Sequence, residues 1–111
     1  MSFSPGDVLP VPVVFSDGSG HKNRRVVIVF DSGDADLLVG PVTSQAARSS
    51  RDVAVANWQR AGLRLPSFVR LEKLATVEKS TVDRKMGNLA PDDWEKVKTV
   101  LKQFFADILA R

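Results

Sequence analysis

Short runs of alternating or continuous apolar residues fill the first two-thirds of the chain, which is the pattern of β-strands. Residues 9–15 are apolar at every second position, and Pro10 and Pro12 fall on the opposite face. Because proline has no N–H to donate to a neighbouring strand, we expect this strand to be bulged or to lie at a sheet edge. Residues 26–30 form a continuous, mostly β-branched run, which is typical of a strand buried on both faces.

The segments between and after these strands are more polar or more broken. Residues 17–24 are predicted to form a long polar connection, 31–34 a tight turn and 46–51 a loop. Residues 57–62 favour a turn of helix. Further strands are predicted at 37–42, 53–55, 67–72, 75–77 and 81–86.

The end of the chain has the spacing of a helix. Apolar residues recur there at steps of three and four: Trp94, Val97, Leu101, Phe104 and Ile108. Pro91 suits the first helical position, and Asp92 and Asp93 complement the positive end of the helix dipole. Ala90 then occupies the N-cap, where Ser or Asp would be better. The expected fold class is mainly β with a C-terminal helix, a small and partly open barrel, in a single domain over residues 1–111.

Composition removes several kinds of chemistry. The chain has no cysteine, so disulfides, cysteine zinc sites and cysteine nucleophiles are excluded, and His21 is the sole histidine. Sixteen Lys and Arg against 13 Asp and Glu give a net charge of +3, a mild bias toward acidic partners such as nucleic acid. No apolar run approaches the ~20 residues of a membrane span. We see no secretion signal and expect a cytoplasmic location without a membrane partner.

Two polar groups of residues flank predicted strands. Thr43, Ser44 and Gln45 follow a strand directly, where they can bind a phosphate or form an ordinary strand exit. Arg24 and Arg25 stand at the entrance of the most apolar strand. An arginine there can clamp a phosphate with two hydrogen bonds, or it can belong to a solvated surface pair.

Two charged groups allow further readings. Arg70 and Glu72 stand two residues apart, so on a continuous strand they share a face. Such a pair suits general acid–base chemistry, although it is more often a surface ion pair worth under ~1 kcal/mol. A cluster of aspartates at positions 31, 34 and 36 has the composition of a turn rather than the spacing of a calcium loop.

Four segments in the right order resemble the MazF/PemK family of toxins from type II toxin–antitoxin systems. They are residues 15–27, 39–45, 66–74 and 80–89, and the similarity runs from Pro5 into the terminal helix. The resemblance implies an SH3-like barrel, a homodimer and an endoribonuclease that cuts single-stranded RNA without metal or other cofactor. It also implies a cognate antitoxin protein that blocks the RNA site.

The resemblance assigns catalytic roles to Arg25, Thr43, Arg70 and Glu72, with Val26 standing where the family has proline. We expect Arg25 to bind the scissile phosphate, Thr43 to donate a hydrogen bond to it, Glu72 to act as general base and Arg70 to tune Glu72. The products would be a 2′,3′-cyclic phosphate and a 5′-hydroxyl. The expected RNA-binding residues are Ser16, Asp17, Lys22, Arg24, Ser44 and Gln45.

Two other functions fit the same sequence. A gyrase poison similar to CcdB shares the fold by resemblance but needs no phosphate site. An SH3-like interaction module without catalysis is the second alternative, because a fold alone does not determine a function.

Overall fold

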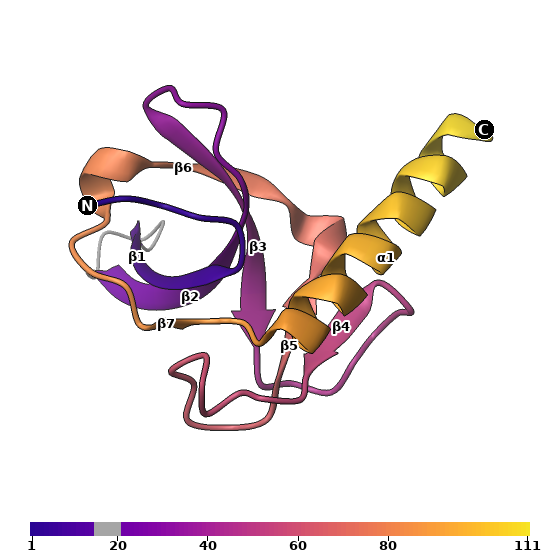
Figure 1. The fold of residues 1–111 in the computed structure, drawn as a ribbon, viewed down its shortest axis with the longest axis horizontal. Coiled ribbons are helices and arrows are strands. Elements are labelled where there is room, and N and C mark those ends of the chain that lie inside the picture. Colours follow the sequence, from indigo (N-terminus) through magenta and orange to yellow (C-terminus); the bar gives the residue numbers. More distant parts are fainter. Residues whose placement is uncertain (15–20) are drawn as a thin grey trace.

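The computed structural model describes residues 1–14 and 21–111, so the predictions for Phe15, Ser16 and Asp17 lie outside the described residues. Seven strands, two 3-10 helices and one α-helix follow in order (Figure 1). They are β1 (Asp7–Val14), β2 (His21–Phe30), β3 (Asp36–Thr43), β4 (Asp52–Val55), β5 (Ser67–Arg70), η1 (Leu71–Lys73), β6 (Ala75–Glu78), η2 (Lys79–Thr81), β7 (Gly87–Asn88) and α1 (Pro91–Leu109).

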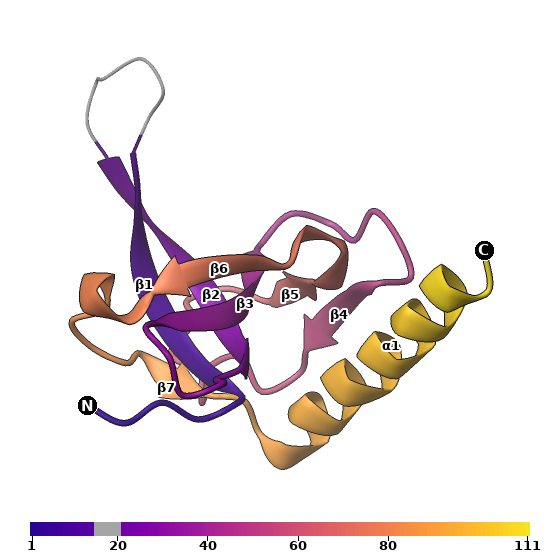
Figure 2. The same ribbon diagram turned by 90° about the horizontal axis from the view of Figure 1, so that it is seen from above.

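All strand pairs are antiparallel, and the sheet has the order β4-β5-β3-β2-β1-β7. The long strand β3 changes partner along its length: its first half pairs with β6 and its last two residues pair with β5. This exchange curves the sheet into a half-barrel, with α1 lying beside β4 (Figures 1 and 2). The predicted mainly-β fold with a C-terminal helix is confirmed.

The β1–β2 pair buries apolar residues on both of its faces. Val8 lies opposite Val27 and packs into one apolar cluster, whereas Leu9, Val26 and Ile28 pack into a second cluster on the other face. The prediction of a strand buried on both faces is therefore confirmed over residues 26–28. It is wrong at Phe30, which is 57% exposed, because the register with β3 shifts after Ile28.

The prolines of β1 lie along a sheet edge, as predicted. On its second side, β1 pairs with β7 only at Asp7 and Val8. Among the described residues no strand pairs with that side farther along, at Pro10 and Pro12. The absent N–H groups of Pro10 and Pro12 therefore leave no hydrogen bond between strands unmade.

Aspartates close the turn between β2 and β3. The Asp31 carboxylate accepts from the Gly33 amide at 2.8 Å, and the Asp34 carboxylate accepts from the Asp36 amide at 2.9 Å. Gly33 has a φ of 93°, which favours glycine. The carboxylates are thus turn acceptors, as their composition predicted.

Two predictions for the connecting segments are wrong. The polar connection is shorter than expected, because β2 already begins at His21. Residues 57–62, by contrast, form the predicted turn of helix, since the Ala61 amide donates to the Asn57 carbonyl oxygen at 3.3 Å. Residues 81–86 are not a strand: only Val82 among them is buried, which is too little to fix a strand against the core. The short strand is instead Gly87–Asn88, where a side chain at Gly87 would meet the Arg60 carbonyl oxygen at 2.6 Å.

Helix α1 begins after Ala90, as predicted, and its N-cap makes no side-chain hydrogen bond. Asp93 is 1% exposed and accepts from the amides of Ala56 and Asn57 at 3.0 and 2.9 Å, which fixes the helix to the exit of β4. Burial would raise the pKa of Asp93, but these amides and the Lys96 ammonium outweigh it and hold the pKa below its usual range. The apolar stripe is buried at Val97 and Leu101, whereas Ile108 is 48% exposed.

The bare N-cap predicts that Ala90→Ser stabilises the protein. A serine hydroxyl at this position can accept from the Asp93 amide, so we expect the free energy of unfolding to rise by about 0.5–2 kcal/mol. Urea denaturation measures this change. The control is Ala106→Ser, the same substitution at an exposed position inside α1, which should lower stability by a few tenths of a kcal/mol. Equal effects of the two substitutions would contradict the capping argument.

Candidate functional site

A cleft of about 650 Å³ opens where β2, the end of β3 and the end of β5 meet. Among the described residues, its lining carries several basic side chains and no acidic one. The lining residues are Lys22, Asn23, Arg24, Arg25, Pro41, Val42, Thr43, Ser44, Gln45, Arg70 and Lys73. Strand geometry explains this convergence, because the exchange of partners on β3 brings Thr43 directly opposite Phe68 of β5. The cleft is therefore a positively charged surface built on rigid strands.

Most of the predicted site residues line this cleft: Arg25, Thr43 and Arg70 of the predicted catalytic set, and Lys22, Arg24, Ser44 and Gln45 of the predicted RNA-binding set. Asn23 and Lys73 also line it, although sequence reasoning missed them. Asn23 could have been found from strand alternation, because it lies two residues from Arg25 on the same strand and so shares its face. Lys73 could not, because it lies in the 3-10 helix η1, which the sequence did not predict.

Thr43 closes β3 and begins the cleft wall. Its Oγ1 accepts from the Gln45 amide at 3.1 Å, a local turn that threonine commonly forms at a strand exit. Because the hydroxyl is used only as an acceptor in this contact, its proton is left to donate toward the cleft. A smaller pocket of about 80 Å³ adjoins the cleft, and Arg25, Thr43 and Ser44 line both.

Two arginines of the cleft carry buried donors that have no acceptor. Nε of Arg25, together with Nε and Nη2 of Arg70, is buried without a hydrogen-bond partner among the described residues. Buried polar groups in proteins are almost always hydrogen-bonded, because an unmade bond costs about 1–3 kcal/mol. Within residues 1–14 and 21–111 no group supplies this acceptor, so the donors are open to a bound ligand. Carboxylate or phosphate oxygens fit a guanidinium best, since they accept two parallel hydrogen bonds.

Glu72 does not line the cleft. The prediction that it shares a strand face with Arg70 is wrong, because β5 ends at Arg70 and the next residues form the 3-10 helix η1. Each residue of a 3-10 helix turns by about 120°, which breaks the alternation of the strand. Leu71 consequently points into the core, Lys73 lines the cleft and Glu72 faces a different group of residues.

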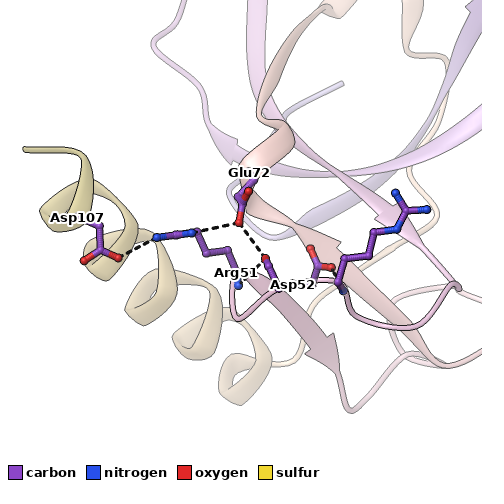
Figure 3. Close-up of polar contacts among 6 residues, drawn as sticks. Arg51, Asp52, Glu72 and Asp107 are labelled. Carbon is purple, nitrogen blue, oxygen red and sulfur yellow. Dashed lines mark hydrogen bonds and ion pairs between the residues drawn. The ribbon is translucent and has the colours of Figure 1, made fainter. Parts of the chain in front are cut away.

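That group is an ion-pair network centred on Arg51 (Figure 3). Nη1 of Arg51 lies 3.2 Å from Oε1 of Glu72, and its Nη2 lies 3.0 Å from Oδ2 of Asp107 on α1. The guanidinium also lies 4.8 Å from the centre of the Phe104 ring. Ser49 donates its hydroxyl to the same Glu72 oxygen at 2.9 Å. The network joins the loop before β4, η1 and the C-terminal helix.

The network fixes the charge of both carboxylates. The Ser49 hydroxyl, and then the Arg51 guanidinium, hold the pKa of Glu72 below its usual range. The Gln103 amide and Arg51 lower the pKa of Asp107 in the same way. A general base at neutral pH works best with a pKa close to that pH, so these contacts oppose the expected role of Glu72. Sequence reasoning missed Arg51 because its partner Asp107 is 56 residues away.

The sequence of residues 4–105 matches the family model described as PemK-like, MazF-like toxin of type II toxin–antitoxin system. The chain belongs to this toxin family. Its resemblance to MazF/PemK toxins, inferred from four sequence segments, is thereby confirmed. A search of curated proteins found no match.

Solved structures share the fold of this toxin at low identity. A mycobacterial endoribonuclease in complex with its cognate antitoxin is 16% identical with a TM-score of 0.77, covering 95% of this chain and 96% of that one. The Mycobacterium tuberculosis toxin MazF-mt6 is 21% identical with a TM-score of 0.67, covering 87% and 96%. MazF in a MazE-MazF crystal structure from Deinococcus radiodurans is 12% identical with a TM-score of 0.76, covering 96% and 98%.

Two further observations concern residues 1–14 and 21–111 only. Their acidic and histidine side chains do not gather in threes at any point where a metal ion could be held. The toxin's one α-helix in these ranges is too polar to cross a bilayer.

Proposed function

We propose that this toxin is an endoribonuclease that cleaves single-stranded RNA in the cleft between β2, β3 and β5. The observation that carries the proposal is a set of buried guanidinium donors on Arg25 and Arg70. In the part of the chain that the structure describes, these donors have no partner and the cleft has no acidic lining residue. An RNA phosphate supplies the acceptor oxygens that these donors lack. The remaining basic side chains of the lining attract the adjacent phosphates of the strand.

RNA carries its own nucleophile, so the toxin's task is positioning and charge stabilisation. In the proposed reaction the 2′-hydroxyl gives up its proton to water, its oxygen attacks the adjacent phosphorus, and the bond from phosphorus to the 5′-oxygen breaks. A 2′,3′-cyclic phosphate forms, and the leaving oxygen takes up a proton to become a 5′-hydroxyl. Single-stranded RNA is the substrate because its backbone can adopt the in-line geometry that this attack needs, whereas a duplex holds it away from that geometry.

Each cleft residue has a defined part in this reaction. Arg25 and Arg70 hold the phosphate and stabilise the charge that grows on its oxygens in the transition state. The Thr43 hydroxyl donates a further hydrogen bond. Arginine stays protonated at neutral pH, so water rather than Arg25 supplies the proton to the leaving oxygen. Glu72 is left out of proton transfer, since its carboxylate is engaged by Ser49 and Arg51.

We also propose a homodimer and a cognate antitoxin as partners. The far end of α1 exposes apolar side chains at Phe105, Ile108 and Leu109, which suits a surface covered by another chain. Solved relatives include toxins bound to an antitoxin. Light scattering of the purified toxin should give twice the 12.2 kDa of the chain at micromolar concentration. A mass of 12.2 kDa, that of one chain, at every concentration would contradict the dimer.

Single-turnover cleavage of labelled RNA, measured with RNA affinity, tests the proposed function. Arg25→Ala and Arg70→Ala should each slow cleavage by about 10²–10³-fold, because each removes charged donors that act in the transition state. Thr43→Val should slow it less, since a neutral hydroxyl makes a weaker bond. Cleavage by the native toxin should persist in EDTA.

Two variants serve as controls. Lys102→Ala removes one positive charge from an exposed position on α1 and should cut at the native rate. Glu72→Gln should also retain most of the cleavage rate. Native rates in both arginine variants would overturn the assignment of the cleft. Loss of cleavage in Glu72→Gln, with the fold and RNA affinity unchanged, would restore Glu72 as the base.

A further inference from the structure

A second polar groove, of about 290 Å³, lies next to the cleft along the β1–β2 pair. It is lined by Pro10, Pro12, Asn23, Thr81, Asp83 and Arg84. Asn23 lines both this groove and the cleft, so the two are neighbours along the sheet. None of its other residues has a role in the proposed cleavage.

The strand register shows how the two sites connect. Asn23 of β2 lies opposite Pro12 of β1, and Arg25 lies opposite Pro10. Residues directly opposite each other in an antiparallel pair share a face, and so do residues two apart on a strand. Arg25, Asn23 and the two prolines therefore form one continuous face that runs from the cleft to the edge of β1.

The far wall of the groove comes from the segment after η2, which follows the unpaired edge of β1. The Met86 amide donates to the Val8 carbonyl oxygen at 2.8 Å and fixes this segment beside the strand. The segment thus lies on the opposite side of β1 from β2. An RNA strand that leaves the cleft at Asn23 reaches it by crossing β1.

The side chains of the groove suit a nucleotide. Asn23 offers a donor and an acceptor for the edge of a base, and the Asp83 carboxylate offers acceptors. The Thr81 hydroxyl donates to the Glu78 carbonyl oxygen at 2.7 Å, so its oxygen is left to accept. The exposed ring of Pro12 offers an apolar surface for the flat face of the base.

Arg84 is exposed, and no ion pair of Arg84 occurs among the described residues. Two nearby lysines are by contrast engaged, Lys79 with Asp31 at 2.8 Å and Lys85 with Asp7 at 3.2 Å. Arg84 is therefore available for a phosphate.

We propose that this groove binds a nucleotide that flanks the cleaved bond in the same RNA strand, with Arg84 on its phosphate and Asp83 and Asn23 on its base. The inference rests on the proposed function, because it extends the RNA path out of the cleft. If the groove binds this nucleotide, it selects for RNA that is long enough to reach it and for the identity of a base outside the cleaved bond.

Binding of 2′-O-methyl RNA tests the groove without any need for catalysis. One probe is a nine-nucleotide strand that reaches past the cleft, and the other is a trinucleotide that fills the cleft alone. Arg84→Ala should weaken binding of the long probe about threefold to tenfold and leave the trinucleotide unchanged. For the long probe, it should also reduce the slope of the logarithm of the binding constant against the logarithm of the salt concentration, by the amount expected for about one phosphate contact. Arg84→Lys should restore most of the affinity.

Asp83→Asn and Lys102→Ala complete the design. Asp83→Asn should change the relative affinities of long probes that differ in one flanking base, whereas Lys102→Ala should behave as the native protein does. The proposal for the groove would be overturned if Arg84→Ala weakened binding of the long probe and of the trinucleotide equally, or weakened binding of neither. Failure of the native toxin to cut RNA would instead overturn the proposed function, because the binding comparison does not depend on cutting.

Discussion

The burial of guanidinium donors that have no acceptor among the described residues is the constraint around which the candidate site is built. Arg25 and Arg70 each keep at least one N–H group away from water and unbonded within the described residues. The free-energy cost of a buried, unbonded donor is tolerated at a binding site, because a bound ligand supplies the missing acceptor. The strands make this possible, because β2 and β5 hold the two arginines on rigid backbone on either side of β3.

Glu72, two residues from the cleft residue Arg70, is held in a separate ion-pair network. Arg51 binds both Glu72 and Asp107, and the 3-10 turn η1 directs Glu72 toward it while the next residue, Lys73, lines the cleft. If Glu72 faced the cleft instead, its carboxylate would pair with the arginines and compete with a phosphate. The network thus keeps the cleft cationic and joins its wall to the C-terminal helix (Figure 3).

Periodicity predicted most of the fold because the buried positions are regular. The continuous run at residues 26–28 and the helical stripe at Val97 and Leu101 both face the core. The strand predicted at 81–86 failed because its alternation rests on a single buried residue, Val82. The short strand at Gly87 depends on a close approach to the Arg60 carbonyl oxygen, which the local sequence does not encode.

The candidate site was predictable where its residues lie on regular strands. Arg25 and Thr43 keep the positions that the strand pattern gave them, and the order of the four segments supplied their expected roles. Glu72 was misplaced because a two-residue spacing implies a shared face only while the strand continues. Arg51 escaped prediction because its partners come from η1 and α1, which the chain brings together only after folding.

The central claim is that a phosphate of RNA accepts hydrogen bonds from the buried N–H groups of Arg25 and Arg70. Arginine-detected NMR measures it directly, by following the Nε–H signals during titration with 2′-O-methyl RNA. The account predicts that the Nε–H signals of Arg25 and Arg70 move downfield and exchange more slowly with water, while that of Arg51 stays unchanged. Signals of Arg25 and Arg70 that do not respond while RNA binds elsewhere would contradict it.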